Sequence, residues 1–134
     1  MDAGEFALAI RAYTRAALSL GLTVDVLSAI GSAHLRLGRL NQAERFLRQA
    51  LDQDDRFIPA LNNLGVTLNS KGELGEAREL FRIAFALDNG SSDEIRDNLR
   101  LLDAKLENFG ATEAVPADFR LVRRGNGQYS LLGN

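Results

Sequence analysis

Apolar residues recur three or four positions apart along most of the chain, a spacing that places them on one face of an α-helix. Interruptions divide this pattern into six predicted helices, over residues 3–20, 24–37, 40–53, 57–70, 74–87 and 92–108. Gly38 and Gly72 fall between helical segments, where a left-handed residue commonly ends a helix. Pro59 falls in the first turn of the fourth segment, where its missing amide costs no hydrogen bond. The pattern therefore predicts an all-α fold.

The residue pattern also repeats at an interval of 34 positions. Ten positions of one stretch match ten of the next: Leu27, Ile30, Gly31, His34, Gly38, Leu40, Ala43, Leu47, Ala50 and Asp54 align with Leu61, Leu64, Gly65, Leu68, Gly72, Leu74, Ala77, Phe81, Ala84 and Asp88. A half copy precedes them at Gly4, Phe6, Ala9, Tyr13, Ala16 and Leu20. A period of this length indicates a solenoid, in which each unit buries its apolar face against its neighbours.

The matched positions spell Leu27-x2-Ile30-Gly31-x2-His34 and then Ala43-x3-Leu47, and the second copy keeps this spacing. This sequence pattern resembles the signature of the tetratricopeptide repeat, with Leu in place of its Trp. The resemblance covers residues 3 to 109. It implies antiparallel helix-turn-helix repeats stacked as a short right-handed superhelix, an α-solenoid, followed by a non-helical tail or β-hairpin. It also implies a non-catalytic protein that binds proteins or peptides.

The repeat register divides the chain into five segments: a half repeat with only its second helix over residues 1–21, repeats over 24–54 and 57–88, a capping helix over 92–109, and a linker with a possible hairpin tail over 110–134. Ser91 and Glu94 have the spacing of a capping box at the start of the last helix. The unpaired half repeat predicts that the chain is a piece of a longer array. Alternatively, a helix or tail of another copy fills that place.

Two glycines and the only histidine are explained by packing. Gly31 and Gly65 lie inside apolar helical segments, where glycine costs about 1 kcal/mol relative to alanine. Such glycines are expected where a neighbouring helix approaches the backbone closely. His34 takes the repeat position of Leu68, so a packing role is expected rather than catalysis or metal binding.

Composition narrows the possible chemistry. Of 134 residues, 46% are hydrophobic. There are 16 Lys and Arg against 18 Asp and Glu, so the chain has no excess of positive charge that would favour binding to nucleic acid. The absence of Cys and the single His argue against a metal site or a cofactor. Asp52, Asp54 and Asp55 are clustered, but Asp54 or Asp55 is expected to cap the fourth helix rather than bind calcium. No apolar run is long enough to span a membrane, which leaves the cytoplasm and the periplasm open.

A binding groove is the expected functional site. In repeats of this kind the first helix of each pair lines a concave surface on which peptides lie. Helical spacing places ten candidate residues there: Asp25, Ser28, Ser32, Arg36, Asn62, Asn63, Val66, Asn69, Arg96 and Arg100. The asparagine amides suit a peptide backbone, because each both donates and accepts hydrogen bonds. Arg96 and Arg100 lie one turn apart and are expected to hold a carboxylate. The alternative is an ordinary solvated helix face.

The expected function is that of an adaptor for a protein or peptide partner. The composition is similar to tetratricopeptide proteins of bacterial pilus assembly and secretion, notably the Tad (Flp) type. Some family members hold chaperone C-termini through a clamp of Lys and Asn. Here Asn63 matches that clamp, whereas Asp93 and Asp97 stand where basic residues are expected, so this subtype is disfavoured. The alternative function is self-association through the open half repeat and the C-terminal tail, which would form a homo-oligomer.

Overall fold

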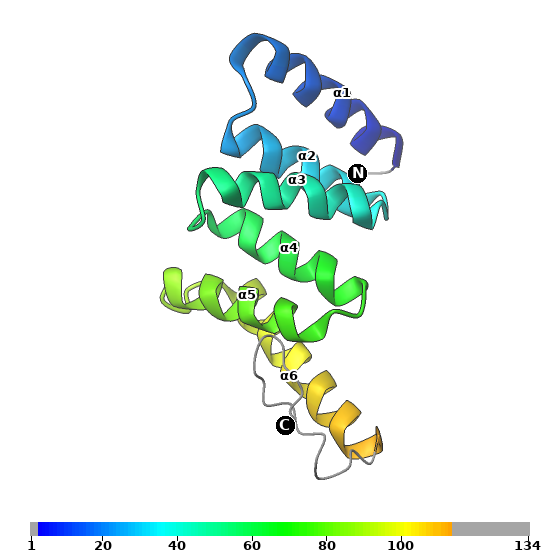
Figure 1. Cartoon of the computed structure of the whole chain (residues 1–134), viewed down its shortest axis with the longest axis vertical. Helices are drawn as coiled ribbons and strands as arrows, with labels where there is room; N and C mark the ends of the chain where they lie inside the picture. Colours follow the sequence, from blue (N-terminus) through cyan, green and yellow to red (C-terminus); the bar gives the residue numbers. More distant parts are fainter. Residues whose placement is uncertain (1–2, 114–134) are drawn as a thin grey trace.

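The structure is a computed structural model that describes residues 3–113. In this part of the chain there are six helices: α1 (Ala3–Leu20), α2 (Val24–Arg36), α3 (Leu40–Gln53), α4 (Ile58–Ser70), α5 (Leu74–Leu87) and α6 (Asp93–Glu113). They are stacked in chain order, with α1 at one end and α6 at the other (Figure 1). Each helix packs against the next, and α4 also contacts both α2 and α6. The predicted all-α stack of helix-turn-helix repeats is confirmed.

The first five helices begin and end within one residue of their predicted limits. The sixth does not, because α6 continues through residue 110, where we predicted a linker, and ends at Glu113. Ala111 and Glu113 are good helix formers, and no proline interrupts the chain before Pro116. The hairpin expected around residues 125–127 lies outside the described part of the chain.

Left-handed glycines end the first helix of each complete pair, as predicted. Gly38 has a φ of 78° and Gly72 a φ of 84°. The turn at Gly72 is closed by the amide of Glu73, which donates to the Leu68 carbonyl at 2.9 Å. This six-residue hydrogen bond is typical of a helix that ends in a left-handed residue. The two turns therefore send α3 and α5 back along α2 and α4.

Two predicted helix caps are wrong. Helix α6 is capped by Ser92 rather than Ser91, because the Ser92 hydroxyl accepts from the Ile95 amide at 3.2 Å. Helix α4 begins after Phe57 and has no side-chain cap. Asp54 instead ends α3, and its carboxylate accepts from the Arg56 amide at 3.0 Å. Both helices begin one residue later than predicted, because the sequence pattern does not define the exact end of the preceding turn.

The core is built on the two buried glycines. A Cβ atom on Gly31 would lie 2.6 Å from Leu47 Cγ, and one on Gly65 would lie 2.5 Å from Phe81 Cε1. Leu47 and Phe81 are completely enclosed, so each fills the space that a side chain on the facing helix would need. The predicted close approach of paired helices is confirmed at both positions. Besides these close contacts, α2 and α4 also pack against each other.

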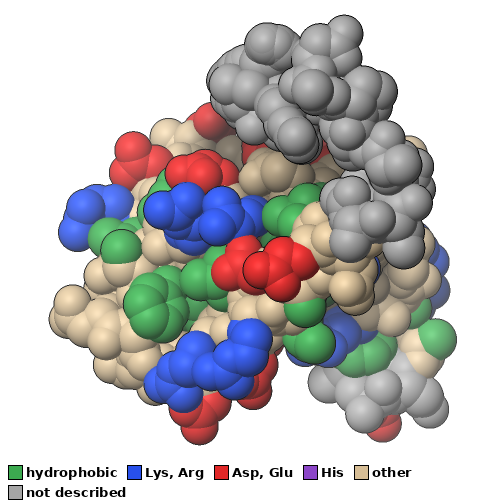
Figure 2. Space-filling model, turned by 90° about the horizontal axis from the view of Figure 1, so that it is seen from below, with side chains coloured by type: hydrophobic (Ala, Val, Ile, Leu, Met, Phe, Trp, Pro, Cys, Tyr) green, Lys and Arg blue, Asp and Glu red, His purple; other side chains and the backbone are tan. Residues whose placement is uncertain are grey.

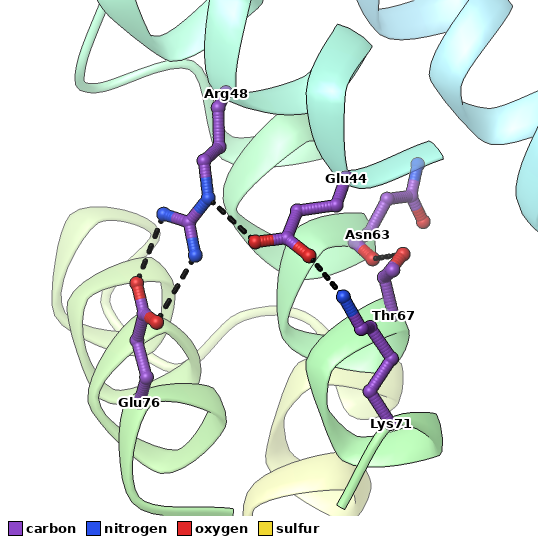
Figure 3. A network of polar contacts seen from close by, with 6 residues as sticks. All are labelled: Glu44, Arg48, Asn63, Thr67, Lys71 and Glu76. Carbon is purple, nitrogen blue, oxygen red and sulfur yellow. Dashed lines mark hydrogen bonds and ion pairs between the residues drawn. The ribbon is translucent and has the colours of Figure 1, made fainter. Parts of the chain in front are cut away.

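Ion pairs join successive repeats. Glu44 of α3 accepts from Arg48 at 2.9 Å and from Lys71, just after α4, at 2.6 Å (Figure 3). The Arg48 guanidinium also makes two bonds of 3.0 Å to the carboxylate of Glu76 in α5. The hydrogen bond from Lys71, supported by Arg48, lowers the pKa of Glu44. The network connects α3 to α5 and to the residue that follows α4, but because its side chains are partly exposed, its net contribution to stability is modest.

His34 is buried beside α3, where its ring stacks on Phe46 with 5.5 Å between the centroids. Burial, followed by the nearby charges of Arg39 and Arg45, lowers the pKa of His34. The imidazole is therefore neutral in the folded chain at neutral pH. This environment fits the predicted packing role.

The lowered pKa predicts a pH dependence of stability. Below pH 6.5 the unfolded chain protonates His34 while the folded chain resists, so the free energy of unfolding falls as the pH falls. Replacing His34 with Leu, the residue at the equivalent position 68, removes this part of the slope. Urea unfolding between pH 7 and pH 5 measures the effect. Equal slopes for the two proteins would contradict the assignment.

Candidate binding groove

A groove of about 390 Å³ opens between α1, α2 and the start of α4. Its lining residues come from all three helices: Phe6, Ala9 and Tyr13 from α1, Asp25, Ser28, Ala29, Ser32 and Ala33 from α2, and Phe57, Pro59 and Asn63 from the α4 region. The helical spacing of 6, 9 and 13 and of 25, 28, 29, 32 and 33 places each set on one face. The groove therefore runs along α2, with α1 and α4 as its two walls.

The lining is apolar with a few polar groups. Phe6, Tyr13 and Phe57 supply aromatic surface, and Asp25 is the only charged side chain. The side chain of Asn63 has no hydrogen-bond partner among the described residues; the Thr67 hydroxyl bonds instead to the Asn63 backbone carbonyl (Figure 3). The amide is therefore free to bind a ligand. Apolar walls with few polar groups are typical of ligand sites in proteins.

Four of the ten predicted residues line this groove: Asp25, Ser28, Ser32 and Asn63. The other six, which do not line it, are Arg36, Asn62, Val66, Asn69, Arg96 and Arg100. Val66 packs partly against the core. Arg36 is exposed at the end of α2. The structure thus brings together Asp25, Ser28 and Ser32 of α2 with Asn63 of α4.

Two predicted asparagines are engaged within the protein. Asn62 is buried and donates to Glu94 at 3.1 Å, while its amide oxygen accepts from Asn98 at 3.1 Å. Asn69 accepts from Lys105 at 2.8 Å. These bonds join α4 to α6, so both side chains stabilise the packing of these two helices. Because their partners lie 32 to 36 residues away, no local pattern indicated this role.

The two predicted arginines are also paired. Arg96 donates to Asp93 at 2.8 Å and to the Gly90 carbonyl at 2.8 Å. Arg100 lies 3.6 Å from Asp97. Each aspartate precedes its arginine by three positions, a spacing that brings side chains together on a helix. This signal is present in the sequence, and it weakens the case for a carboxylate held between the two arginines.

Sequence reasoning missed the aromatic residues of the groove. Phe6 and Tyr13 were assigned only to the half repeat, and Phe57 only to the start of a helix. The repeat register aligns Tyr13 with the buried Leu47 and Phe81, but the exposure of Tyr13, at 37%, is seen only in the structure, and no sequence signal indicates Phe57. A core position that remains open marks a place where something else can bind.

Figure 2 shows acidic and basic side chains interspersed, with small apolar patches between them, on the face seen from below. Among the described residues no group of three or more His, Asp or Glu is placed to hold a metal ion. None of the described helices is long and apolar enough to cross a membrane.

Comparison with solved structures supports the fold. The chain is similar to the first TPR domain of Spaghetti (RPAP3) bound to the HSP90 peptide SRMEEVD, with 21% identity, a TM-score of 0.72, and coverage of 78% of this chain and 82% of that one. It is also similar to the Sgt2 TPR domain from Aspergillus fumigatus, with 23% identity, a TM-score of 0.77, and coverage of 94% and 84%. A third is the second TPR domain of human RPAP3 with an HSP70 peptide, at 23% identity, a TM-score of 0.67, and coverage of 75% and 82%.

The sequence itself matches the family model described as the tetratricopeptide repeat, over residues 1–56 and 28–92. No curated protein matches the chain. The matched residues cover more than half of the 134-residue sequence. The chain therefore belongs to the tetratricopeptide repeat family, whose fold binds proteins and is non-catalytic, and the prediction that it is not an enzyme is confirmed.

Proposed function

We propose that this protein is an adaptor that holds a segment of a partner protein in the groove between α1, α2 and α4. The observation that carries the proposal is the lining of that groove, which combines the aromatic rings of Phe6, Tyr13 and Phe57 with the polar side chains of Ser32 and Asn63. Aromatic surface supplies most of the affinity in such sites, and a few hydrogen-bonding groups fix the orientation of the ligand.

The charge of the groove indicates which partners fit. Two of the similar structures hold the chaperone peptides SRMEEVD and SGPTIEEVD, which have acidic C-terminal ends. The groove of this chain has Asp25 as its only charged lining residue. Asp25 is exposed at the groove, and its carboxylate repels acidic groups and favours a cation. We therefore expect a partner segment with apolar side chains and a Lys or Arg near Asp25.

Selection from a random peptide library displayed on phage, with the full chain as bait, tests the proposal. We expect the selected peptides to be apolar and basic, and their affinity to fall roughly tenfold on Asp25→Lys and on Asn63→Ala, because each change removes a contact in the groove. Fluorescence anisotropy of the synthetic peptides gives the dissociation constants. The peptide SRMEEVD should bind the unchanged protein more weakly than they do, and should gain affinity on Asp25→Lys.

Arg100→Glu is the matched control, because Arg100 is exposed on α6 and lies outside the groove. This charge reversal should leave the affinity of the selected peptides unchanged. Peptides that respond to Arg100→Glu but not to the two groove substitutions would place the binding site on α6 and contradict the proposal. A role in pilus assembly or secretion stays a prediction that rests on the composition of the sequence and on the arrangement of its C-terminal part.

A further inference from the structure

Leu101 of α6 is exposed at a repeat position that is buried in the two complete repeats. Steps of 34 residues align Ala33 of α2, Thr67 of α4 and Leu101 of α6. Ala33 and Thr67 are 5% and 0% exposed, whereas Leu101 is 66% exposed. A single exposed leucine is ordinary on a protein surface, but this one lies where the repeat otherwise places a buried residue. The position therefore marks apolar surface that the described helices do not cover.

Helix α6 meets α4 on both sides of Leu101 through hydrogen bonds. Asn98, three positions before Leu101, donates to Asn62 at 3.1 Å. Lys105, four positions after Leu101, donates to Asn69 at 2.8 Å. Spacings of three and four residues place these side chains on the face of α6 that carries Leu101. Leu101 thus lies beside the contact with α4, while most of its side chain remains in water.

The charges on this face of α6 have a fixed order. From the C-terminal end of the helix, the exposed side chains are Lys105, Leu101 and Asp97, each four positions from the next. Asp97 lies 3.6 Å from Arg100, yet 62% of its side chain is exposed. Glu94, one turn further back, is also exposed. The row therefore reads basic, apolar and acidic in the direction away from the end of α6.

A segment with the opposite order of charges follows α6 in the sequence. Residues 118–124, which lie outside the described part of the chain, read Asp-Phe-Arg-Leu-Val-Arg-Arg. This run is acidic at its start, carries Phe119, Leu121 and Val122 in the middle, and ends with two arginines. A chain that runs back antiparallel to α6 would therefore place opposite charges beside one another at both ends of the apolar contact.

The connection is long enough for this return. Leu101 precedes Glu113, the last residue of α6, by 12 positions, which is about 18 Å along a helix that rises about 1.5 Å per residue. Phe119 follows Glu113 by six positions, or about 20 Å of extended chain at about 3.3 Å per residue, and Leu121 adds about 7 Å for the turn at the helix end. The exposed leucines of α1 lie at the opposite end of the stack (Figure 1).

We propose that residues 118–124 of this chain run back along α6 and cover Leu101. In an extended segment the side chains of Phe119 and Leu121 point to the same side, so both can contact the leucine. Docking within one chain is favoured because a short tether gives an effective concentration in the millimolar range. It also supports the hairpin expected in this part of the sequence, since an isolated two-stranded hairpin is only marginally stable.

Disulfide formation tests the docking directly, because the chain has no cysteine of its own. The full chain with Leu101→Cys and Leu121→Cys is equilibrated with reduced and oxidised glutathione, and mass spectrometry measures the intramolecular disulfide. Cysteine keeps a small apolar side chain at position 101. The matched control is Arg100→Cys with Leu121→Cys. Position 100 is exposed and adjacent in sequence, but its side chain points about 100° further round the helix.

We expect the effective concentration of the two thiols to be at least roughly tenfold higher for the pair at 101 than for the pair at 100. Adding Phe119→Asp to the first pair should lower its value to that of the control, because the apolar contact is lost. Equal values for the two pairs, no effect of Phe119→Asp, or a disulfide that joins two chains would each overturn the inference. The groove between α1, α2 and α4 involves none of these residues, so its peptide affinities test the adaptor function separately.

Discussion

Replacing Phe81 with Ala is expected to lower the free energy of unfolding by about 3–5 kcal/mol. The ring is 1% exposed and lies against the backbone of Gly65, so its removal leaves a cavity that neighbouring helices cannot close. A loss of this size is a large part of the total stability of a domain, which is about 5–15 kcal/mol. Urea unfolding followed by circular dichroism measures it.

Tyr13→Ala provides a comparison at the same repeat position. Its ring is already 37% exposed, so truncation removes less buried surface and should cost no more than about 1–2 kcal/mol. The contrast isolates the effect of the covering helix, because the two residues share one register and differ in whether a first helix lies over them. Equal losses for the two variants would mean that Tyr13 is as deeply buried in solution as Phe81.

Much of the fold can be predicted because each repeat position occurs more than once in the sequence, so the same structural explanation must fit every residue at that position. Gly31 and Gly65, for example, occupy one register, and each is explained by the same contact with the second helix of its pair. The left-handed Gly38 and Gly72 are likewise predicted from their place between two apolar patterns. Local propensity, periodicity and close packing agree at these positions, which makes the prediction of helices reliable.

The candidate site was predicted less completely, because the exposure of a polar residue depends on contacts between distant residues. Asn62 and Asn63 are adjacent in sequence, yet Asn62 is buried and hydrogen-bonded to Glu94 and Asn98, whereas Asn63 lines the groove. Helical spacing alone cannot separate them. The aromatic wall was missed for the opposite reason, since Tyr13 occupies a core position in the register and only the structure shows that it is open.

The second large effect is expected from Gly65→Val, which should lower the free energy of unfolding by about 3 kcal/mol, the upper end of the range for overpacking. Its Cβ atom would lie 2.5 Å from Phe81 Cε1 and 2.8 Å from Cζ, and the buried ring has nowhere to move. The slightly better helix propensity of valine offsets only a few tenths of a kcal/mol. Gly75→Val is the control, since nothing lies within 4 Å of its Cβ position, and it should change stability by no more than about 0.5 kcal/mol.

Combining Gly65→Val with Phe81→Ala tests whether both losses come from one contact. In the single variants, valine at position 65 has too little space and alanine at position 81 leaves a cavity. In the double variant the valine methyl groups fill part of the cavity left by the ring. The double variant should therefore be more stable than the sum of the two single losses predicts, by about 1–3 kcal/mol. Strict additivity in urea unfolding would contradict the fit between the two side chains.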